Sequence, residues 1–155
     1  MLIRDQNQAR SVAVGMEKRA IRVYERALMI VQDDAVAAGI RGILADEREH
    51  LRRFSAMRKE DAAPAEDKIL TDAMAADALF EGGVMSMVRE KALADVESTY
   101  AYAAQSERQA VETYNAMAEK CVDEDVKKAF RSIAMEEAGH LAALNRELNK
   151  IRKGE

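Results

Sequence analysis

The feature that most constrains this chain is a pattern of glutamate, tyrosine and histidine that occurs twice, 90 residues apart. Residues 17–50 match residues 107–140 without a gap. The repeated positions are the pairs Glu17/Glu107, Tyr24/Tyr114, Glu47/Glu137 and His50/His140. The two histidines are the only ones in the chain, and each follows a glutamate by three residues. Chance would seldom give this arrangement, and it indicates a two-metal site built from two similar halves.

The rest of the sequence favours helix almost everywhere. Only seven Gly, one Pro and no Trp occur among 155 residues, and Ala, Glu, Lys, Arg and Met are abundant. Short acidic side chains cap helices, so Asp5 and Asp95 are predicted caps, and Asp33-Asp34 and Asp123-Glu124 are predicted turns before second helices. The expected helices are 5–32, 34–60, 95–121 and 124–152.

These helices predict an all-α fold, a four-helix bundle made of two repeated hairpins. The hairpins cover residues 5–60 and 95–152, and the crossover 61–94 joins them within a single domain, 1–155. The crossover holds Pro64, Gly82-Gly83 and a short amphipathic stretch, Ile69 to Phe80, expected as one small helix. The alternative is a disordered linker between separate hairpins. It is less favoured because neither hairpin could bury its glutamate-bearing face alone.

Each predicted helix carries polar residues inside its apolar stripe. In the fourth helix, Glu137 and His140 fall on the same face as Phe130, Ile133 and Leu144. A carboxylate facing a core costs several kcal/mol unless it is neutralised, so each stripe requires a partner. If the hairpins pack about a two-fold axis that crosses the bundle, six side chains converge: Glu17, Glu47, His50, Glu107, Glu137 and His140.

Four carboxylates and two imidazoles suit two iron ions per chain, with manganese or zinc as alternatives. Bundles with a carboxylate-bridged metal pair use one Glu from each of two helices and a Glu-x-x-His from each of the other two. By that analogy Glu47 and Glu137 bridge the metals, Glu17 and Glu107 are terminal, and each ion has one His. Tyr24 and Tyr114 are expected to support catalysis by hydrogen-bonding the ligand carboxylates. A role as redox-active relays is the alternative.

At these residues the chain resembles the ferritin-like superfamily, and within it the rubrerythrin-type di-iron proteins. The resemblance rests on Glu17 to Tyr24, Glu107 to Tyr114, Glu47-Arg-Glu-His50 and Glu137-Ala-Gly-His140, which together span most of residues 5–152. It implies a ferritin-like four-helix bundle, a di-iron centre, and reaction of the ferrous pair with hydrogen peroxide or oxygen.

Three departures limit this resemblance. Rubrerythrins usually append a rubredoxin-like domain with four cysteines, whereas this sequence has one cysteine, so an external electron donor is expected. Ala110 stands where peroxidase rubrerythrins place a further glutamate, which puts their ligand-switching mechanism in doubt. Arg48 stands where bacterioferritins have a haem-ligating methionine, and no haem site is inferred.

The charge and the apolar segments of the sequence limit the kinds of partner that are expected. A net charge of −4 and a pI near 5.4 argue against a nucleic-acid binder. The absence of an apolar run of 18 or more residues and of a signal segment argues against membrane insertion and favours a cytoplasmic protein. Cys121 is expected as a partly buried, inert thiol. Little sequence follows the last ligand, so we expect a homodimer rather than a mineral-filled cage.

Two classes of function remain. The leading one is an oxidoreductase of the rubrerythrin-like peroxidase or ferroxidase kind, active in the oxidative-stress response, which oxidises Fe(II) with hydrogen peroxide or oxygen. The alternative is a non-catalytic iron-binding or iron-delivery protein.

Overall fold

The structure is a computed structural model that describes residues 6–57 and 95–154. In these residues the chain forms four helices and no strand, which confirms the all-α prediction. The helices are α1 (Gln6–Ile30), α2 (Asp34–Ala56), α5 (Val96–Lys120) and α6 (Glu124–Lys153). Their bounds agree with the predicted ones to within a few residues. The predicted crossover 61–94, its short helix and the cap Asp5 lie outside the described residues.

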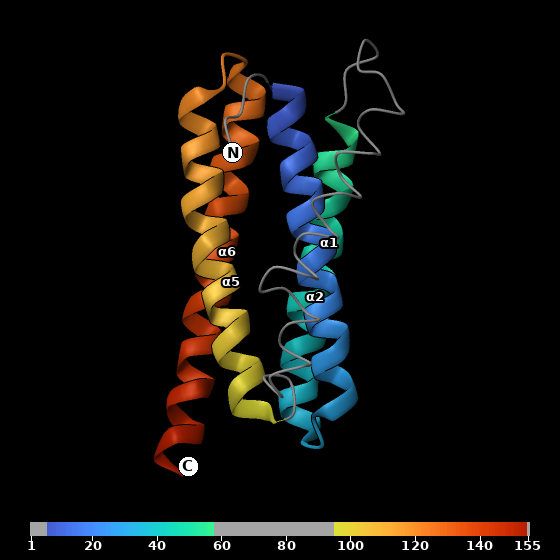
Figure 1. Cartoon of the computed structure of the whole chain (residues 1–155), viewed down its shortest axis with the longest axis vertical. Coiled ribbons are helices and arrows are strands. Elements are labelled where there is room, and N and C mark those ends of the chain that lie inside the picture. Colours follow the sequence, from blue (N-terminus) through green and yellow to red (C-terminus); the bar gives the residue numbers. More distant parts are fainter. Residues whose placement is uncertain (1–5, 58–94, 155) are drawn as a thin grey trace.

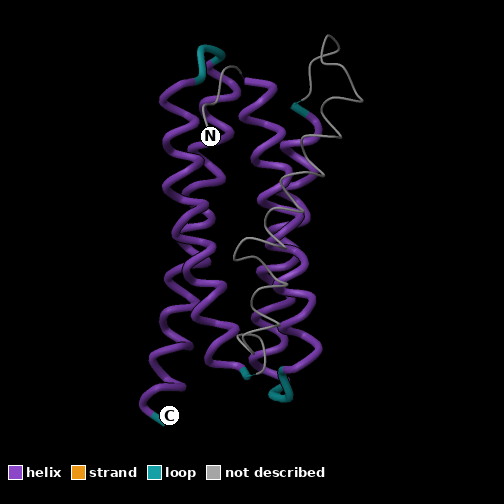
Figure 2. Tube along the Cα trace, in the orientation of Figure 1, coloured by secondary structure: helices purple, strands orange, loops and turns teal. Residues whose placement is uncertain are grey.

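The four helices lie side by side with their long axes nearly aligned (Figure 1, Figure 2). α1 packs along α2 and α5 packs along α6, so each half is a hairpin. The hairpins meet chiefly where α1 lies along α5. α2 ends and α5 begins at opposite ends of the bundle (Figure 1). The molecule is thus the predicted bundle of two hairpins, with neighbouring helices antiparallel.

The helix ends follow the capping chemistry expected from the sequence. The side chain of Asp33 accepts a hydrogen bond from the backbone N–H of Val36, and Asp95 accepts one from Ser98. The cap Asp123 accepts from two backbone N–H groups of α6. Because these bonds satisfy otherwise unpaired donors, they fix where α2, α5 and α6 begin. The C-cap of α6 is Gly154, whose left-handed φ of 72° carries little strain in glycine.

The apolar core is divided into two clusters. One lies toward the end of the bundle where α5 joins α6 and includes Phe54, Tyr114, Met117, Phe130 and Ile133. The other lies toward the end where α1 joins α2 and includes Val23, Tyr24, Ile40, Leu144 and Leu148. In every helix the predicted ligands fall between positions of the first cluster and positions of the second. A polar layer therefore crosses the bundle between two apolar blocks.

The predicted burial of Cys121 is confirmed, since this C-cap residue of α5 is buried in the first cluster. Burial raises the pKa of its thiol, which disfavours the reactive thiolate.

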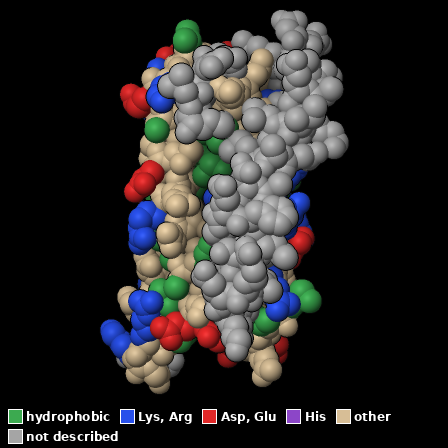
Figure 3. All heavy atoms as spheres, in the orientation of Figure 1, with side chains coloured by type: hydrophobic (Ala, Val, Ile, Leu, Met, Phe, Trp, Pro, Cys, Tyr) green, Lys and Arg blue, Asp and Glu red, His purple; other side chains and the backbone are tan. Residues whose placement is uncertain are grey.

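Figure 3 shows part of one face of the described helices. On the face drawn in Figure 3, the Lys and Arg side chains of the described helices are interspersed with Asp and Glu. Among the described residues, no helix is both long and apolar enough to span a membrane.

Candidate metal centre

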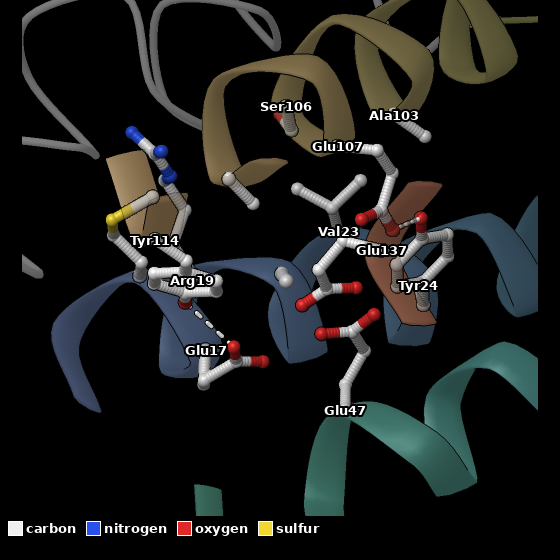
Figure 4. A pocket seen from close by; sticks show the side chains of 13 residues that line it. Glu17, Arg19, Val23, Tyr24, Glu47, Ala103, Ser106, Glu107, Tyr114 and Glu137 are labelled. Atoms are coloured by element: carbon white, nitrogen blue, oxygen red, sulfur yellow. Dashed lines mark hydrogen bonds between the residues drawn. The ribbon is translucent and has the colours of Figure 1, made fainter. Parts of the chain in front are cut away.

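The polar layer contains the six side chains that the sequence analysis selected, and all six are buried. Each hairpin contributes three of them. α1 carries Glu17, α2 carries Glu47 and His50, α5 carries Glu107, and α6 carries Glu137 and His140. Figure 4 shows the four carboxylates pointing toward one another from the four helices. The antiparallel packing thus brings mid-helix positions to one depth, as expected.

The six side chains form two overlapping groups. Glu17, Glu47, His50 and Glu137 make the first group, and Glu47, Glu107, Glu137 and His140 make the second. In each group every residue offers one ligand atom, and these atoms lie within 4.8 Å of one another. Glu47 and Glu137 belong to both groups. Two metal ions that share two carboxylates require this arrangement.

The individual distances show why these two carboxylates are shared. Nδ1 of His50 lies 3.1 Å from Oε1 of Glu137, and Nδ1 of His140 lies 2.9 Å from Oε2 of the same residue. Glu47 likewise has Oε2 at 3.7 Å from His50 and Oε1 at 3.0 Å from His140. Glu17 approaches only His50, and Glu107 approaches only His140, each at 3.7 Å. Two glutamates therefore span both halves, and two belong to one half each.

The tyrosines link the two hairpins. Tyr24 of α1 donates a hydrogen bond to Glu107 of α5, and Tyr114 of α5 donates one to Glu17 of α1 at 2.6 Å (Figure 4). Burial raises the pKa of both hydroxyls well above the usual value, so they stay protonated as donors. This geometry fits the expected role of holding the terminal carboxylates in place.

The sequence analysis missed two candidate functional residues, Glu136 and Asp46. Nε2 of His50 lies 2.6 Å from Glu136, and Nε2 of His140 lies 2.9 Å from Asp46. Each ring therefore points Nδ1 at the carboxylate layer and Nε2 at an acidic residue of the other hairpin. Such partners fix the orientation of a metal-binding imidazole. A signal was present, because an acidic residue directly precedes Glu47 and Glu137 in both copies of the repeat.

Without metal, the layer holds protons. Burial raises the pKa of Glu17 well above its usual value and that of Glu107 to about 10. Burial also opposes ionisation of Glu47, but His140 and His50 outweigh it and lower the pKa of Glu47. Burial alone would lower the pKa of the histidines, yet Glu137 and its neighbours raise that of His140 to about 11 and that of His50 further. Protons thus offset the buried negative charge.

The donor set fits a pair of divalent metals. Oε2 of Glu17 is buried without a hydrogen-bond partner. Oε1 of Glu47 also makes no hydrogen bond, although His140 Nδ1 lies 3.0 Å away. Buried carboxylate oxygens without partners are costly, and a cation would satisfy them. Carboxylate oxygens with imidazole nitrogens suit iron or manganese and can hold zinc.

A small cavity adjoins the carboxylates between α1 and α5. Its volume is about 20 Å³, close to what one water molecule requires. Val23, Ala103 and Ala110 give it apolar walls, while Glu17 and Glu107 border it (Figure 4). The layer therefore has room beside it for a molecule about the size of water.

We predict that the metal-free protein loses stability as the pH rises from about 6.5 to about 9. Glu17, Glu107, His50 and His140 bind protons more tightly when folded than when unfolded, so folding takes up protons in this window. Each such proton lowers the unfolding free energy by about 1.4 kcal/mol per pH unit. Thermal melts in chelator, at pH 6.5, 7.5 and 9, measure the slope.

The variant Glu107→Gln supplies the control. A glutamine keeps the shape and the acceptor for Tyr24 but carries no titrating proton, so its slope should be smaller and its melting temperature at pH 9 higher than wild type. A wild-type melting temperature that is flat or rising over this range would contradict the prediction.

Comparison with known proteins agrees with this geometry. The family model described as a ferritin-like domain matches residues 7–150, which include all four helices up to the last turn of α6. No significant match was found among curated proteins or solved structures. The matched range also contains all six buried ligand-type side chains. The chain therefore belongs to the ferritin-like domain family.

Proposed function

We propose that this protein is a di-iron oxidoreductase of the rubrerythrin-like peroxidase or ferroxidase kind, which oxidises Fe(II) with hydrogen peroxide or oxygen. One observation carries the proposal. Glu47 and Glu137 each reach both histidines with separate oxygens, while Glu17 and Glu107 each reach one. That pattern suits a pair of ions held side by side better than one ion or two distant ones.

In this proposal each ion has its own ligands and shares two others. Glu17 and His50 would hold one ion, Glu107 and His140 the other, and Glu47 and Glu137 would bridge them. A ferrous pair would supply the two electrons that, together with two protons, convert one hydrogen peroxide molecule to two waters. The four carboxylates balance the charge of two divalent ions, so the polar layer stays neutral when its protons are released. Tyr24 and Tyr114 hold the terminal carboxylates through their hydroxyl protons.

The cavity between α1 and α5 supports a small oxidant. Its volume of about 20 Å³ suits a molecule about the size of water, such as oxygen or hydrogen peroxide. An external donor would return electrons to the iron pair, and the proposal includes a homodimer as the working assembly.

The bridging roles can be tested by metal stoichiometry. After anaerobic loading with Fe(II), wild type should bind two ions per chain. Glu17→Gln and Glu107→Gln should each retain about one, because each removes a ligand from one half. Glu47→Gln and Glu137→Gln should retain fewer, because a bridge serves both ions. Iron analysis after gel filtration measures this, with circular dichroism as the check on folding. Equal losses in all four variants would contradict the bridging assignment.

The activity itself can be tested by single-turnover mixing. The diferrous protein is mixed anaerobically with one equivalent of hydrogen peroxide and, separately, with oxygen, while the near-ultraviolet ferric band is followed. We expect two ferric ions per peroxide consumed, and no band in Glu47→Gln at matched iron concentration. Iron that stays ferrous with both oxidants would instead favour an iron-binding or iron-delivery protein.

A further inference from the structure

The two halves of the polar layer differ in the contacts made by the acidic residue that meets Nε2 of each histidine. Behind His50, Glu136 also receives a hydrogen bond from Arg53 Nη1 at 3.1 Å. Arg53 Nη2 reaches the hydroxyl of Ser132 at 3.5 Å. Arg53 belongs to α2 and its two partners to α6, so a chain of contacts ties His50 to a fixed carboxylate.

Among the described residues, the acidic partner of His140 has no such series of contacts. Asp46 contacts Nε2 of His140 at 2.9 Å, and no Lys or Arg of the described helices pairs with it. The repeat explains the difference, because the position that corresponds to Arg53 is Ala143, and the one that corresponds to Ser132 is Gly42. The contacts of Arg53 with Glu136 and Ser132 therefore have no counterpart in the other copy of the repeat.

The histidine and its acidic partner are also more buried in the His50 half than in the His140 half. The side chain of His50 is 0% exposed and that of His140 is 9% exposed. Glu136 is 43% exposed, whereas Asp46 is 57% exposed. The contact to Nε2 is also shorter in the first half, at 2.6 Å against 2.9 Å. Water can therefore compete for Asp46 more readily than for Glu136.

We propose that Arg53 is a positioning residue that braces His50 through Glu136, so that the His50 half binds metal more tightly than the His140 half. This inference rests on the proposed function, since it assumes one ion in each half. Fixing the acceptor behind a metal-binding imidazole fixes the ring, and losing such partners typically costs 10- to 100-fold in metal affinity. The ion beside His140 is then the one that exchanges first.

The direction in which removal of Arg53 changes metal affinity shows whether Arg53 acts by positioning His50 or by its charge. Arg53 is a cation, so through charge alone its removal would strengthen metal binding. Its charge is offset by the carboxylate of Glu136, with which it pairs at 3.1 Å. We therefore expect the loss of positioning to dominate, and removal to weaken binding.

The test is anaerobic Fe(II) titration calorimetry on the full chain. Wild type should show two steps of unequal affinity. Arg53→Ala should weaken the tighter step about three- to tenfold and leave the weaker step unchanged. Arg52→Ala is the matched control, because Arg52 pairs with Glu49 on the surface and does not contact Glu136. It removes the same charge at the adjacent position and should change neither step.

Single-ion backgrounds assign the steps to the halves. Glu107→Gln should keep the ion beside His50, and adding Arg53→Ala should weaken that ion. Glu17→Gln should keep the ion beside His140, and the same addition should have no effect. A general loss of fold would weaken both ions, so selectivity for one half reports positioning.

The brace can also be transplanted. Ala143 lines a surface cavity of about 320 Å³ between α2 and α6, which leaves room for an arginine. Asp46 is one methylene shorter than Glu136, so the double variant Asp46→Glu with Ala143→Arg is compared with Asp46→Glu alone. The double variant should bring the weaker step closer to the tighter one, although it adds a positive charge.

A spectroscopic readout accompanies the titrations. In the Co(II)-loaded protein the Nε2 protons of His50 and His140 should give paramagnetically shifted signals that exchange with solvent. The signal of His50 should exchange more slowly in wild type and faster in Arg53→Ala. Two equal steps in wild type, or stronger or unchanged binding in Arg53→Ala, would overturn the brace while leaving the proposed function intact. Fewer than two ions in wild type would overturn both.

Discussion

The structure depends on the burial of four carboxylates in one layer of a helical bundle. Each would cost several kcal/mol if it were charged and unpaired, and the bundle sets all four within reach of one another. The metal-free layer offsets this charge with protons on Glu17, Glu107 and the two histidines. Two divalent ions would offset it equally well. The same constraint thus links fold stability, proton binding and metal binding.

The two apolar clusters give this layer its geometry. Phe54, Phe130 and Ile133 pack on one side of it, and Ile40, Leu144 and Leu148 on the other. Because the packing on both sides fixes the helices, the carboxylates cannot separate to reach water. The tyrosines add a link between hairpins, since Tyr24 bonds to Glu107 and Tyr114 to Glu17. A repeated hairpin therefore yields a nearly two-fold site, and single differences such as Arg53 against Ala143 make its halves unequal.

Much of this could be predicted from the sequence, because the informative features are local or repeated. Helix caps such as Asp33 and Asp123 act on their own first turn, and a carboxylate such as Glu137 stands out within its apolar stripe. The crossed partners could not be predicted in the same way. Whether Glu136 meets His50, or Asp46 meets His140, depends on how α2 lies against α6, and spacing within one helix does not specify that. The outer contact of Arg53 with Glu136 depends on the same packing.

The sharing of Glu47 and Glu137 between two ions is the claim on which the other functional proposals rest. Anomalous diffraction at the iron edge, from crystals loaded anaerobically with Fe(II), tests it most directly. The account predicts two iron peaks per chain, roughly 3.5–4 Å apart, as in two-metal sites, with an oxygen of Glu47 and of Glu137 on each. A single peak, or two peaks that do not share these carboxylates, would contradict it.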